Sequence, residues 1–303
     1  MFSLPTKFIG STLSNNIIPT GIALKGCNLL INSKYSSLSP ISSYQLQTSP
    51  LQNGLSIKNK NGMMNNYHLK KNSIRFYADS TEKKEKVKSD LRIQIIPAGP
   101  LSVNCCIIND EKSKEALIVD PGGDFEILKN VIEKNKLELK SILLTHAHFD
   151  HVGAVGQLKK HFNCKIYLHE EDMYLWKNQI EQCGFFNLPY KREEELPDKP
   201  DVFLKEDDQI MLNGKSIAKV IHTPGHSKGS VSFYFPKEKV CIVGDTLFKE
   251  SVGRSDLWGG DGTVLRTAIR DKIYPLGDDT CIIPGHGPIT NVAYEKVENF
   301  NVF

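Results

Sequence analysis

The chain has 303 residues, of which 40% are hydrophobic and 24% charged, and this composition excludes disordered, collagen-like and disulfide-rich proteins. The net charge of +3 is unevenly distributed: residues 1–78 contain eight Lys or Arg and no acidic residue, which leaves 30 basic and 35 acidic residues, a net charge of −5, to residues 79–303. This balance argues against nucleic acid as a partner, and the lack of any stretch of about 18 apolar residues argues against a membrane span.

Residues 1–78 are rich in Ser and Asn and show no sustained helical or strand period. A basic, Ser-rich segment without acidic residues is typical of an organelle transit peptide, and residues 74–78 resemble a mitochondrial processing site, with Arg75 just before the cut. We therefore expect the mitochondrial matrix as the location. A plastid-type organelle is the alternative, or the cytoplasm if the leader is only a disordered tail. Residues 79–90 form a charged linker.

From residue 91 onward the sequence alternates between strand and helix patterns. In the first half we expect strands at residues 91–97, 104–109, 116–120, 140–144 and 165–168, and helices at 125–134, 152–162 and 170–182. In the second half we expect strands at 202–204, 209–211, 216–222, 231–235, 239–243 and 280–283, helices at 263–273 and after 290, and a surface excursion at 184–200. Two runs of strands, each followed by helices, predict two sheets back to back with helices outside, in one domain spanning residues 91–303.

A histidine-rich turn, Thr-His-Ala-His-Phe-Asp-His at residues 145–151, follows the strand predicted at 140–144. The imidazoles of His146, His148 and His151 and the carboxylate of Asp150 can converge in such a turn, and they are enough to begin two metal sites. The alternative is a polar turn with accidental histidines. With nine His in 303 residues, so dense a group is improbable by chance.

Three further candidate ligands, His226, Asp245 and His286, each follow a strand at a turn marked by glycine. Together the seven residues offer nitrogen and oxygen ligands but no thiolate. This set suits two divalent metal ions, with zinc as the first choice and iron or manganese as alternatives, and it disfavours a closed structural zinc site. The isolated histidines, His68, His161, His169 and His222, are not expected to be ligands, and His222 is expected to pack or hydrogen-bond instead.

Five phrases accompany the histidine-rich turn in a fixed order: Val-Asp-Pro-Gly-Gly at 119–123, Thr-Pro-Gly-His-Ser at 223–227, Gly-Asp-Thr-Leu-Phe at 244–248, Gly-Arg-Ser-Asp at 253–256 and Pro-Gly-His-Gly-Pro at 284–288. With them the chain resembles the metallo-β-lactamase superfamily, and within it the short, single-domain members of the glyoxalase II (hydroxyacylglutathione hydrolase) branch. The resemblance covers nearly all of residues 91–303. It implies an α/β fold, the four-layer αββα sandwich of two mixed sheets flanked by helices.

The resemblance also implies roles for the seven ligands. One metal would be held by His146, His148 and His226, a second by Asp150, His151 and His286, and Asp245 would bridge both. A hydroxide shared by the metals would attack S-lactoylglutathione or a related acyl-glutathione and release a hydroxy acid and glutathione, with Asp150 orienting the hydroxide. The expected partner is thus a small thiol-derived substrate.

Five residues near these motifs receive supporting roles. Ser255 and Asp256 are candidates to fix a ligand imidazole, with an exposed turn as the alternative. Asp120 would buttress the site from the end of its strand, or serve only the turn. Arg254 and Lys249 lie where glyoxalase II places a glutathione-binding Lys, so they would meet the substrate carboxylates, with a solvated surface as the alternative.

Two other functions compete with thioester hydrolysis. A mononuclear iron persulfide dioxygenase would use His146, His226 and Asp245 as a triad of two histidines and one carboxylate, but the Pro-Gly-His-Gly-Pro ending resembles the hydrolases. A non-enzymatic binding module on the same fold would be expected to lack ligands, and all seven are present. Because only 17 residues follow His286, we expect no C-terminal helical glutathione-binding region and a more open pocket, in which S-lactoylglutathione could be an incidental substrate.

Overall fold

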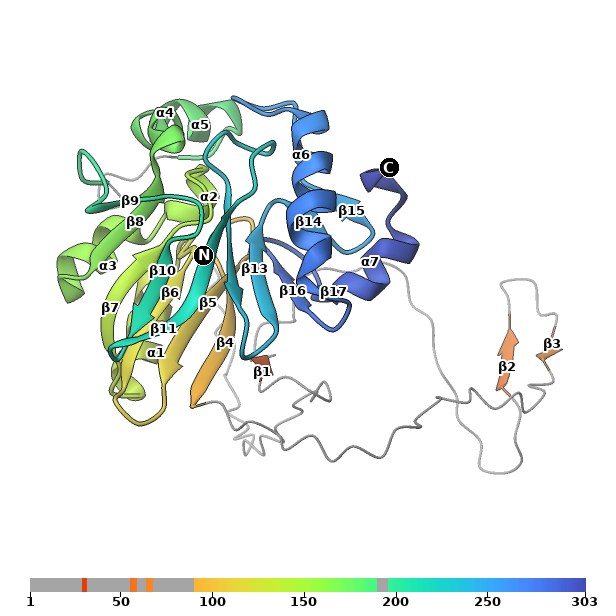
Figure 1. The fold of residues 1–303 in the computed structure, drawn as a ribbon, viewed down its shortest axis with the longest axis horizontal. Helices are drawn as coiled ribbons and strands as arrows, with labels where there is room; N and C mark the ends of the chain where they lie inside the picture. Colours follow the sequence, from red (N-terminus) through yellow and green to blue (C-terminus); the bar gives the residue numbers. More distant parts are fainter. Residues whose placement is uncertain (1–28, 32–54, 59–63, 68–89, 190–195) are drawn as a thin grey trace, which may run out of the picture. The chain divides into compact units, whose positions relative to one another are not determined.

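The computed structural model describes residues 29–31, 55–58, 64–67, 90–189 and 196–303 (Figure 1). The chain divides into two units, Met1–Lys34 with Ser89–Phe303 and Tyr35–Lys88. In the second unit, β2 (Leu55–Lys58) and β3 (Met64–Tyr67) form an antiparallel pair. These two strands and β1 (Leu29–Ile31) lie in the segment where the sequence shows no strand period. The transit peptide itself stays a prediction, and its expected processing site at 74–78 and the linker at 79–89 lie outside the described residues.

The larger unit contains a mixed sheet of seven strands in the order β1-β4-β5-β6-β7-β8-β9. Its further strands are β4 (Leu91–Ala98), β5 (Val103–Asp110), β6 (Glu115–Val119), β7 (Glu138–Leu143), β8 (Lys165–His169) and β9 (Val202–Leu204). The strands from β4 to β6 pair antiparallel, whereas those from β6 to β9 pair parallel.

A second mixed sheet has six strands in the order β10-β11-β12-β13-β16-β17. They are β10 (Gln209–Leu212), β11 (Lys215–His222), β12 (Val231–Phe235), β13 (Val240–Gly244), β16 (Cys281–Pro284) and β17 (Thr290–Asn291). Only β13 and β16 pair parallel. The hairpin of β14 (Leu247–Phe248) and β15 (Ser251–Val252) and the short β17 are additions to the predicted strands.

The helices are α1 (Phe125–Lys134), α2 (Phe149–Val152), α3 (Val155–Phe162), α4 (Met173–Lys177), α5 (Gln179–Phe185), α6 (Gly262–Ala268) and α7 (Val292–Glu298). Shorter turns are η1 (Glu170–Asp172), the π-helical η3 (Ile269–Ile273), η4 (Tyr274–Leu276) and η5 (Phe300–Val302). The helix expected at 152–162 is divided in two because Ala154 N–H donates to the Pro121 carbonyl, 2.9 Å away. No helix in the described ranges is long and apolar enough to cross a membrane.

Three apolar layers hold these elements together. Adjacent residues on β5 point to opposite faces, so that Cys105 joins the core under α1 and α3 whereas Cys106 joins the core between the two sheets. Phe233 on β12 is fully buried between the sheets, where burial of its ring contributes about 2 to 3 kcal/mol. On the outer face of the second sheet, Val243 packs with Leu265 of α6. These layers confirm the predicted αββα sandwich.

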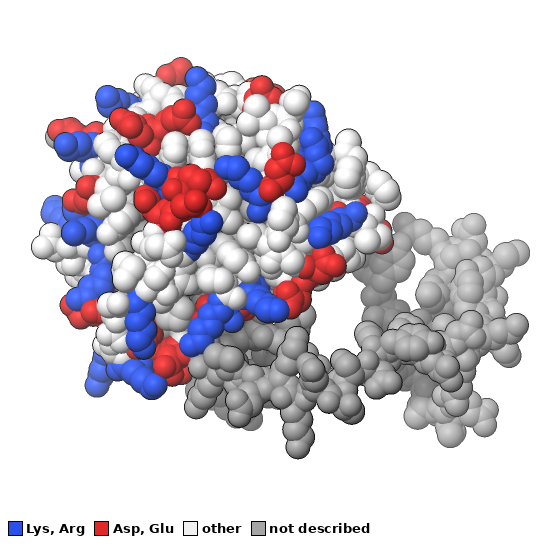
Figure 2. All heavy atoms as spheres, viewed as in Figure 1, with Lys and Arg blue, Asp and Glu red and all other residues white. Residues whose placement is uncertain are grey.

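Figure 1 shows α3 at one side of the paired sheets and α6 and α7 at the other. In the face drawn in Figure 2, Lys and Arg are interspersed with Asp and Glu.

The directions of the strands determine where the candidate ligands lie. The strands β6 and β7 run parallel, and so do β13 and β16. In each pair, the two loops that follow the strands therefore lie at the same edge of the sheet. The histidine-rich turn, Asp245 and His286 all lie in such loops.

Candidate metal centre

The seven predicted ligands come together in one cluster. His146, His148, Asp150 and His151 come from the turn after β7 and from α2, and the other three come from the turns after β11, β13 and β16. The ligands of the turn and α2 are buried, as is His226, whereas Asp245 and His286 retain 13% and 26% of their side-chain exposure. The cluster is therefore mostly buried, and solvent reaches it beside His286.

A first group consists of His146, His148 and His226. The Nε2 atom of His226 lies 2.9 Å from Nδ1 of His148 and 3.2 Å from Nε2 of His146. One ring nitrogen of each residue lies within 4.8 Å of the others. Three imidazole nitrogens that face one another at this spacing can surround a single metal ion.

A second group consists of Asp150, His151 and His286. The Nε2 atom of His286 lies 3.0 Å from Oδ2 of Asp150, and Nε2 of His151 lies 3.6 Å from the same oxygen. Their potential ligand atoms also fall within 4.8 Å of one another. This group offers two nitrogens and a carboxylate, a mixed donor set that suits zinc, iron or manganese.

Asp245 lies between the two groups. Its Oδ1 is 3.4 Å from Nε2 of His151, and its Oδ2 is 3.6 Å from Nε2 of His226 and 3.7 Å from Nε2 of His286. The carboxylate thus reaches nitrogens of both groups, which is the arrangement a bridging ligand needs. Gly285 makes room for it, because a Cβ atom there would collide with Oδ1 of Asp245 and lie 2.8 Å from Cε1 of His151.

The buried atoms of the cluster fit a metal. Among the described residues, Nε2 of His148, Nε2 of His151 and Oδ1 of Asp245 are buried and have no hydrogen-bond partner. A buried polar atom without a partner costs about 1–3 kcal/mol. Nε2 of His151 and Oδ1 of Asp245 face one another and are compatible with a cation as their missing partner, whereas His148 turns Nδ1 and not Nε2 toward His226.

The ionisation states suit the same purpose. Burial lowers the pKa of His146 well below its usual range and that of His148 to about 3, so both rings are neutral and able to bind metal. Burial alone would raise the pKa of Asp245, but the neighbouring His151 and His226 outweigh it and keep the carboxyl ionised. Burial lowers the pKa of His151, and the negative charge of Asp150, Asp245 and Asp120 raises it further than burial lowers it. The same carboxylates would favour a cation.

Asp120 supports the cluster from the end of β6, as the sequence predicts. Its Oδ1 accepts from Thr145 N at 2.8 Å, and its Oδ2 lies 2.6 Å from Thr145 Oγ1 and 3.0 Å from Nδ1 of His151. The hydroxyl of Thr145 in turn lies 3.0 Å from Nδ1 of His146. One carboxylate therefore orients ligands of both groups.

Ser255 and Asp256 are predicted to hydrogen-bond with a ligand imidazole, but the main chain of the preceding residue, Arg254, makes this bond instead. Nδ1 of His226 donates to the carbonyl oxygen of Arg254 at 2.6 Å. The carboxylate of Asp256 accepts from Nε and NH2 of Arg254 at 2.9 and 3.0 Å, in an exposed pair. Ser255 makes no hydrogen bond with a ligand imidazole in the described part of the chain. Asp256 is drawn away because the adjacent guanidinium offers it two parallel donors.

Arg254 and Lys249 separate in the structure. Arg254 lines a cavity of about 280 Å³ above the ligands. Lys249 is absent from that lining, and its Nζ lies 5.1 Å from the ring centre of Tyr294 and 3.9 Å from Glu250. Arg254 is therefore placed to contact a substrate. Lys249 is not, because its side chain lies against Tyr294 and Glu250.

Asp172 is a supporting residue that the sequence does not reveal. Its fully buried carboxylate accepts from Ala147 N at 2.9 Å, from Ser227 Oγ at 2.9 Å and from Gly229 N at 2.7 Å. It therefore ties the histidine-rich turn to the turn that carries His226. Its sequence context, Glu-Glu-Asp at 170–172, is typical of a solvated helix start and gives no local signal of this role.

Three of the isolated histidines lie outside the seven-residue cluster. His169 and His222 stack on one another, with ring centres 4.2 Å apart, and Nε2 of His222 lies 2.9 Å from the carbonyl oxygen of Lys228 and 3.6 Å from Glu171. His161 pairs with Glu133. His222 packs and hydrogen-bonds as predicted, although His169, Glu171 and His222 also bring ligand atoms within 4.8 Å of one another. His68 lies outside the described residues.

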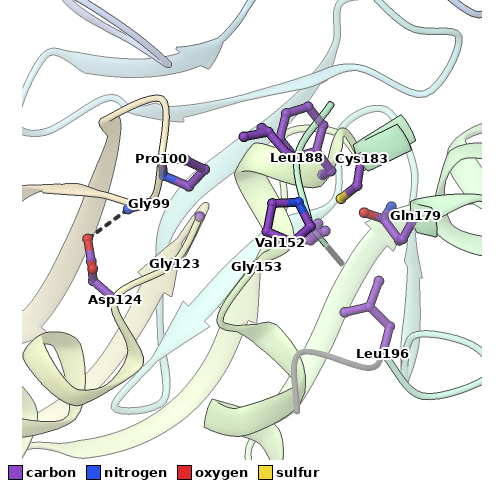
Figure 3. Close-up of a pocket in the computed structure, with 13 residues that line it drawn as sticks. Gly99, Pro100, Gly123, Asp124, Val152, Gly153, Gln179, Cys183, Leu188 and Leu196 are labelled. Carbon is purple, nitrogen blue, oxygen red and sulfur yellow. Dashed lines mark hydrogen bonds between the residues drawn. The ribbon is translucent and has the colours of Figure 1, made fainter. Parts of the chain in front are cut away.

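A second cavity of about 340 Å³ lies next to the first, and Phe149 lines both. Figure 3 shows it surrounded by glycine turns, including Gly99 and Gly123, and by apolar side chains such as Leu188 and Leu196. The Asp124 carboxylate there accepts from Gly99 N at 2.9 Å. Its described lining contains no histidine, so the metal-binding chemistry belongs to the first cavity.

Known proteins resemble this chain in sequence and in fold. A profile of the Metallo-beta-lactamase superfamily matches residues 98–286. Hydroxyacylglutathione hydrolase GloC of Haemophilus influenzae is 41% identical over 210 residues, which cover 69% of this chain and 97% of the relative. Two solved structures are similar as well. BLEG-1 B3 metallo-beta-lactamase has a TM-score of 0.64 and 38% identity, covering 69% of this chain and 99% of its own. TTHA1623 in a di-iron-bound form has a TM-score of 0.61 and 34% identity, covering 68% and 98%.

The matched segment begins at the end of β4 and ends at the last predicted ligand, so it contains all seven residues of the cluster. Since it spans more than half of the chain, and since the relatives match over almost their whole length, the chain belongs to the metallo-β-lactamase superfamily.

Proposed function

We propose that this protein is a binuclear metallohydrolase that splits acyl-glutathione thioesters, of which S-lactoylglutathione is the reference substrate. The observation that carries the proposal is the position of Asp245 between two three-residue groups, within 3.7 Å of nitrogens in both. The relative named hydroxyacylglutathione hydrolase, at 41% identity, supports the substrate class. The di-iron-bound neighbour supports two metals and leaves the choice among zinc, iron and manganese to be measured.

The residues would divide the work as follows. His146, His148 and His226 would hold one ion and Asp150, His151 and His286 the other, with Asp245 shared. Ions bound there would supply a hydroxide at neutral pH and polarise the thioester carbonyl. Asp150 lines the cavity, and one of its carboxylate oxygens lies 3.0 Å from Nε2 of His286. This carboxylate can accept a hydrogen bond from a nucleophile and so orient it. A thiolate leaves readily, so the chain needs no separate acid to protonate it.

Persulfide dioxygenation with a single iron on His146, His226 and Asp245 is the alternative that the first test must exclude. A single iron bound there would not use the second group of ligands. Asp150, His151 and His286 converge as closely as the first group does, and Nε2 of His151 is buried without a hydrogen-bond partner in the described residues. A binding module that lacks activity would not need two complete groups, and this weighs against it as well.

The test uses the full-length protein. Bound metals are counted by mass spectrometry, and the same preparation is assayed for S-lactoylglutathione hydrolysis, for oxygen uptake with glutathione persulfide, and for hydrolysis of a chromogenic β-lactam. We expect about two metal ions per chain and thioester turnover, both reduced in His151→Ala. The control is His161→Ala, because His161 is exposed, forms an ion pair with Glu133 and lies outside the seven-residue cluster. One iron per chain with oxygen uptake, or β-lactam turnover alone, would overturn the proposal.

We further propose that residues 1–78 direct the protein to the mitochondrial matrix. The support is the eight basic and zero acidic residues of this segment. Fusion of residues 1–78 to a fluorescent protein, followed by imaging and N-terminal sequencing of the imported product, tests the address. Diffuse cytoplasmic fluorescence would contradict it, and a plastid signal would select the alternative organelle.

A further inference from the structure

The cavity above the metal ligands is mostly apolar. Beside the ligand residues, its lining consists of five apolar side chains and Arg254; the apolar residues are Leu101, Phe149, Phe186, Phe248 and Leu257. They flank the cluster on both sides: Phe248 lies 6.4 Å, between ring centres, from His286, and Phe149 directly precedes Asp150. A substrate that reaches the metals must therefore lie against apolar surface.

Phe149 and Phe186 line one side of this cavity, and Phe185 and Trp258 continue the same aromatic wall outside the lining. Ring centres lie 5.3 Å apart between Phe149 and Phe186, and 5.2 Å apart for each of the two following pairs, Phe186 with Phe185 and Phe185 with Trp258. The wall ends against the cluster, since Trp258 lies 6.3 Å from His148. Phe149 is buried, whereas Phe186 is half-buried, and both line the cavity.

Charge is scarce around the same cavity. Arg254 is the single Lys or Arg among the described residues that line it, and its Nε and Nη2 atoms already donate to Asp256. Glutathione carries two carboxylates, and binding them strongly would require cations that are not already paired. The glutathione half of a thioester therefore gains less from this cavity than an apolar acyl half does.

From this distribution of contacts, and on the basis of the proposed thioesterase activity, we propose that the preferred substrates carry an acyl group with one aromatic ring, held against Phe149 and Phe186. The cavity of about 280 Å³ lies at the small end of ligand pockets, which begin at about 300 Å³. A single ring fits within a cavity of this size. Aromatic rings that meet at an angle or offset add stabilisation beyond the area they bury.

The test compares two thioesters that differ in one group. S-Mandeloylglutathione replaces the methyl group of S-lactoylglutathione by a phenyl ring and keeps the hydroxyl, the thioester and the glutathione. We expect kcat/KM for the mandeloyl substrate to exceed that for the lactoyl substrate about tenfold, because a phenyl ring buries more apolar surface than a methyl group.

Phe186→Ala should reduce kcat/KM for the mandeloyl substrate and bring the ratio to within about twofold of one, while Phe186→Leu should keep an intermediate ratio. Phe300→Ala is the matched control, because Phe300 is 79% exposed and lies outside the cavity lining; it should keep the full ratio. Metal content of each variant is measured in parallel to show that the cluster is intact.

The outcomes separate this inference from the proposed function. Hydrolysis of both thioesters with a ratio at or below one would overturn the aromatic preference and leave the thioesterase in place. A high ratio that survives in Phe186→Ala would also overturn it, since the wall would then not be the cause. If neither thioester is hydrolysed by the metal-loaded protein, the proposed function fails, and the inference fails with it.

Discussion

Oδ2 of Asp120 lies 3.0 Å from Nδ1 of His151, and both side chains are buried. Because an ionised carboxylate only accepts, the proton of the ring must lie on Nδ1, which leaves Nε2 as the atom available to a metal. That nitrogen points toward Asp245 and Asp150, at 3.4 and 3.6 Å. The contact between Asp120 and His151 thus fixes both the orientation of the ring and the nitrogen that it offers.

Asp120→Asn should weaken the second metal more than the first. An amide has one acceptor oxygen where the carboxylate has two, so it cannot accept from both Thr145 N and His151 Nδ1 with the present geometry, and the hydrogen bond that orients His151 is weakened or lost. Loss of such a partner typically lowers metal affinity about 10- to 100-fold. Titration with a chelator, followed by metal counting, should show one ion released early. Asp271→Asn, at an exposed position, is the control. Equal retention of both ions would contradict the assigned role.

A second prediction concerns Gly285. A Cβ atom at this position would collide with Oδ1 of Asp245 and lie 2.8 Å from Cε1 of His151. Gly285→Ala should therefore displace the bridging carboxylate and lower both metal content and activity, although the residue itself binds nothing. Gly184→Ala is the matched control, because a Cβ there meets no described atom within 4 Å. Metal analysis of the two purified variants checks this; full metal occupancy in Gly285→Ala would show that the carboxylate can move without loss of the site.

Much of the fold and of the ligand set follows from local sequence patterns. The apolar run at Val231–Phe235 and the helical spacing at Phe125–Lys134 give these two elements at their predicted bounds, since period and flanking turn residues determine them. The ligands are recognisable for a similar reason: four occur within six residues, and the other three follow strands at glycine turns. The prediction of one helix at 170–182 was wrong, because the backbone leaves the helical conformation at Asn178, between α4 and α5, and because the segment begins as the separate turn η1.

The supporting contacts do not follow from local patterns. Asp172 contacts residues 25 to 57 positions away, and nothing in its neighbours distinguishes it from a solvated acid. The partner of His226 is the carbonyl of Arg254, and a backbone group carries no signature in the side-chain sequence. Such contacts depend on how distant turns meet at the edge of the two sheets, and this becomes visible only in the folded chain.

The buried carboxyl of Asp172 gives a third prediction, which concerns pH. Burial raises its pKa from the ordinary 3.8 to about 6, against the opposing effect of its hydrogen bonds. The carboxyl group of Asp172 therefore binds its proton more tightly in the folded state than in the unfolded chain. Its contribution to stability is complete below about pH 4 and is lost as the pH rises to about 6. The size of that contribution is about 3 kcal/mol.

Asp172→Asn isolates this effect, because every other titrating group is present in both proteins. The free energy of unfolding is measured by urea denaturation at several pH values, at equal metal content. We expect the advantage of the unsubstituted protein over the variant to shrink between about pH 4 and pH 6 and to stay constant at higher pH. An advantage that grows with pH would mean that the carboxylate, held by Ala147 N, Ser227 Oγ and Gly229 N, is stabilised in its ionised form.

The pair of Arg254 and Asp256 gives the last prediction. The Nε and Nη2 atoms of Arg254 donate to Asp256, and Arg254 also lines the cavity over the ligands. Asp256→Ala should release it to meet a glutathione carboxylate, so KM for S-lactoylglutathione should fall about threefold at low salt and less at high salt. Lys249→Ala should leave KM unchanged, since Lys249 lies over the Tyr294 ring. A rise in KM for Asp256→Ala would show instead that the pair holds Arg254 in its binding position, and that Asp256 positions the cation.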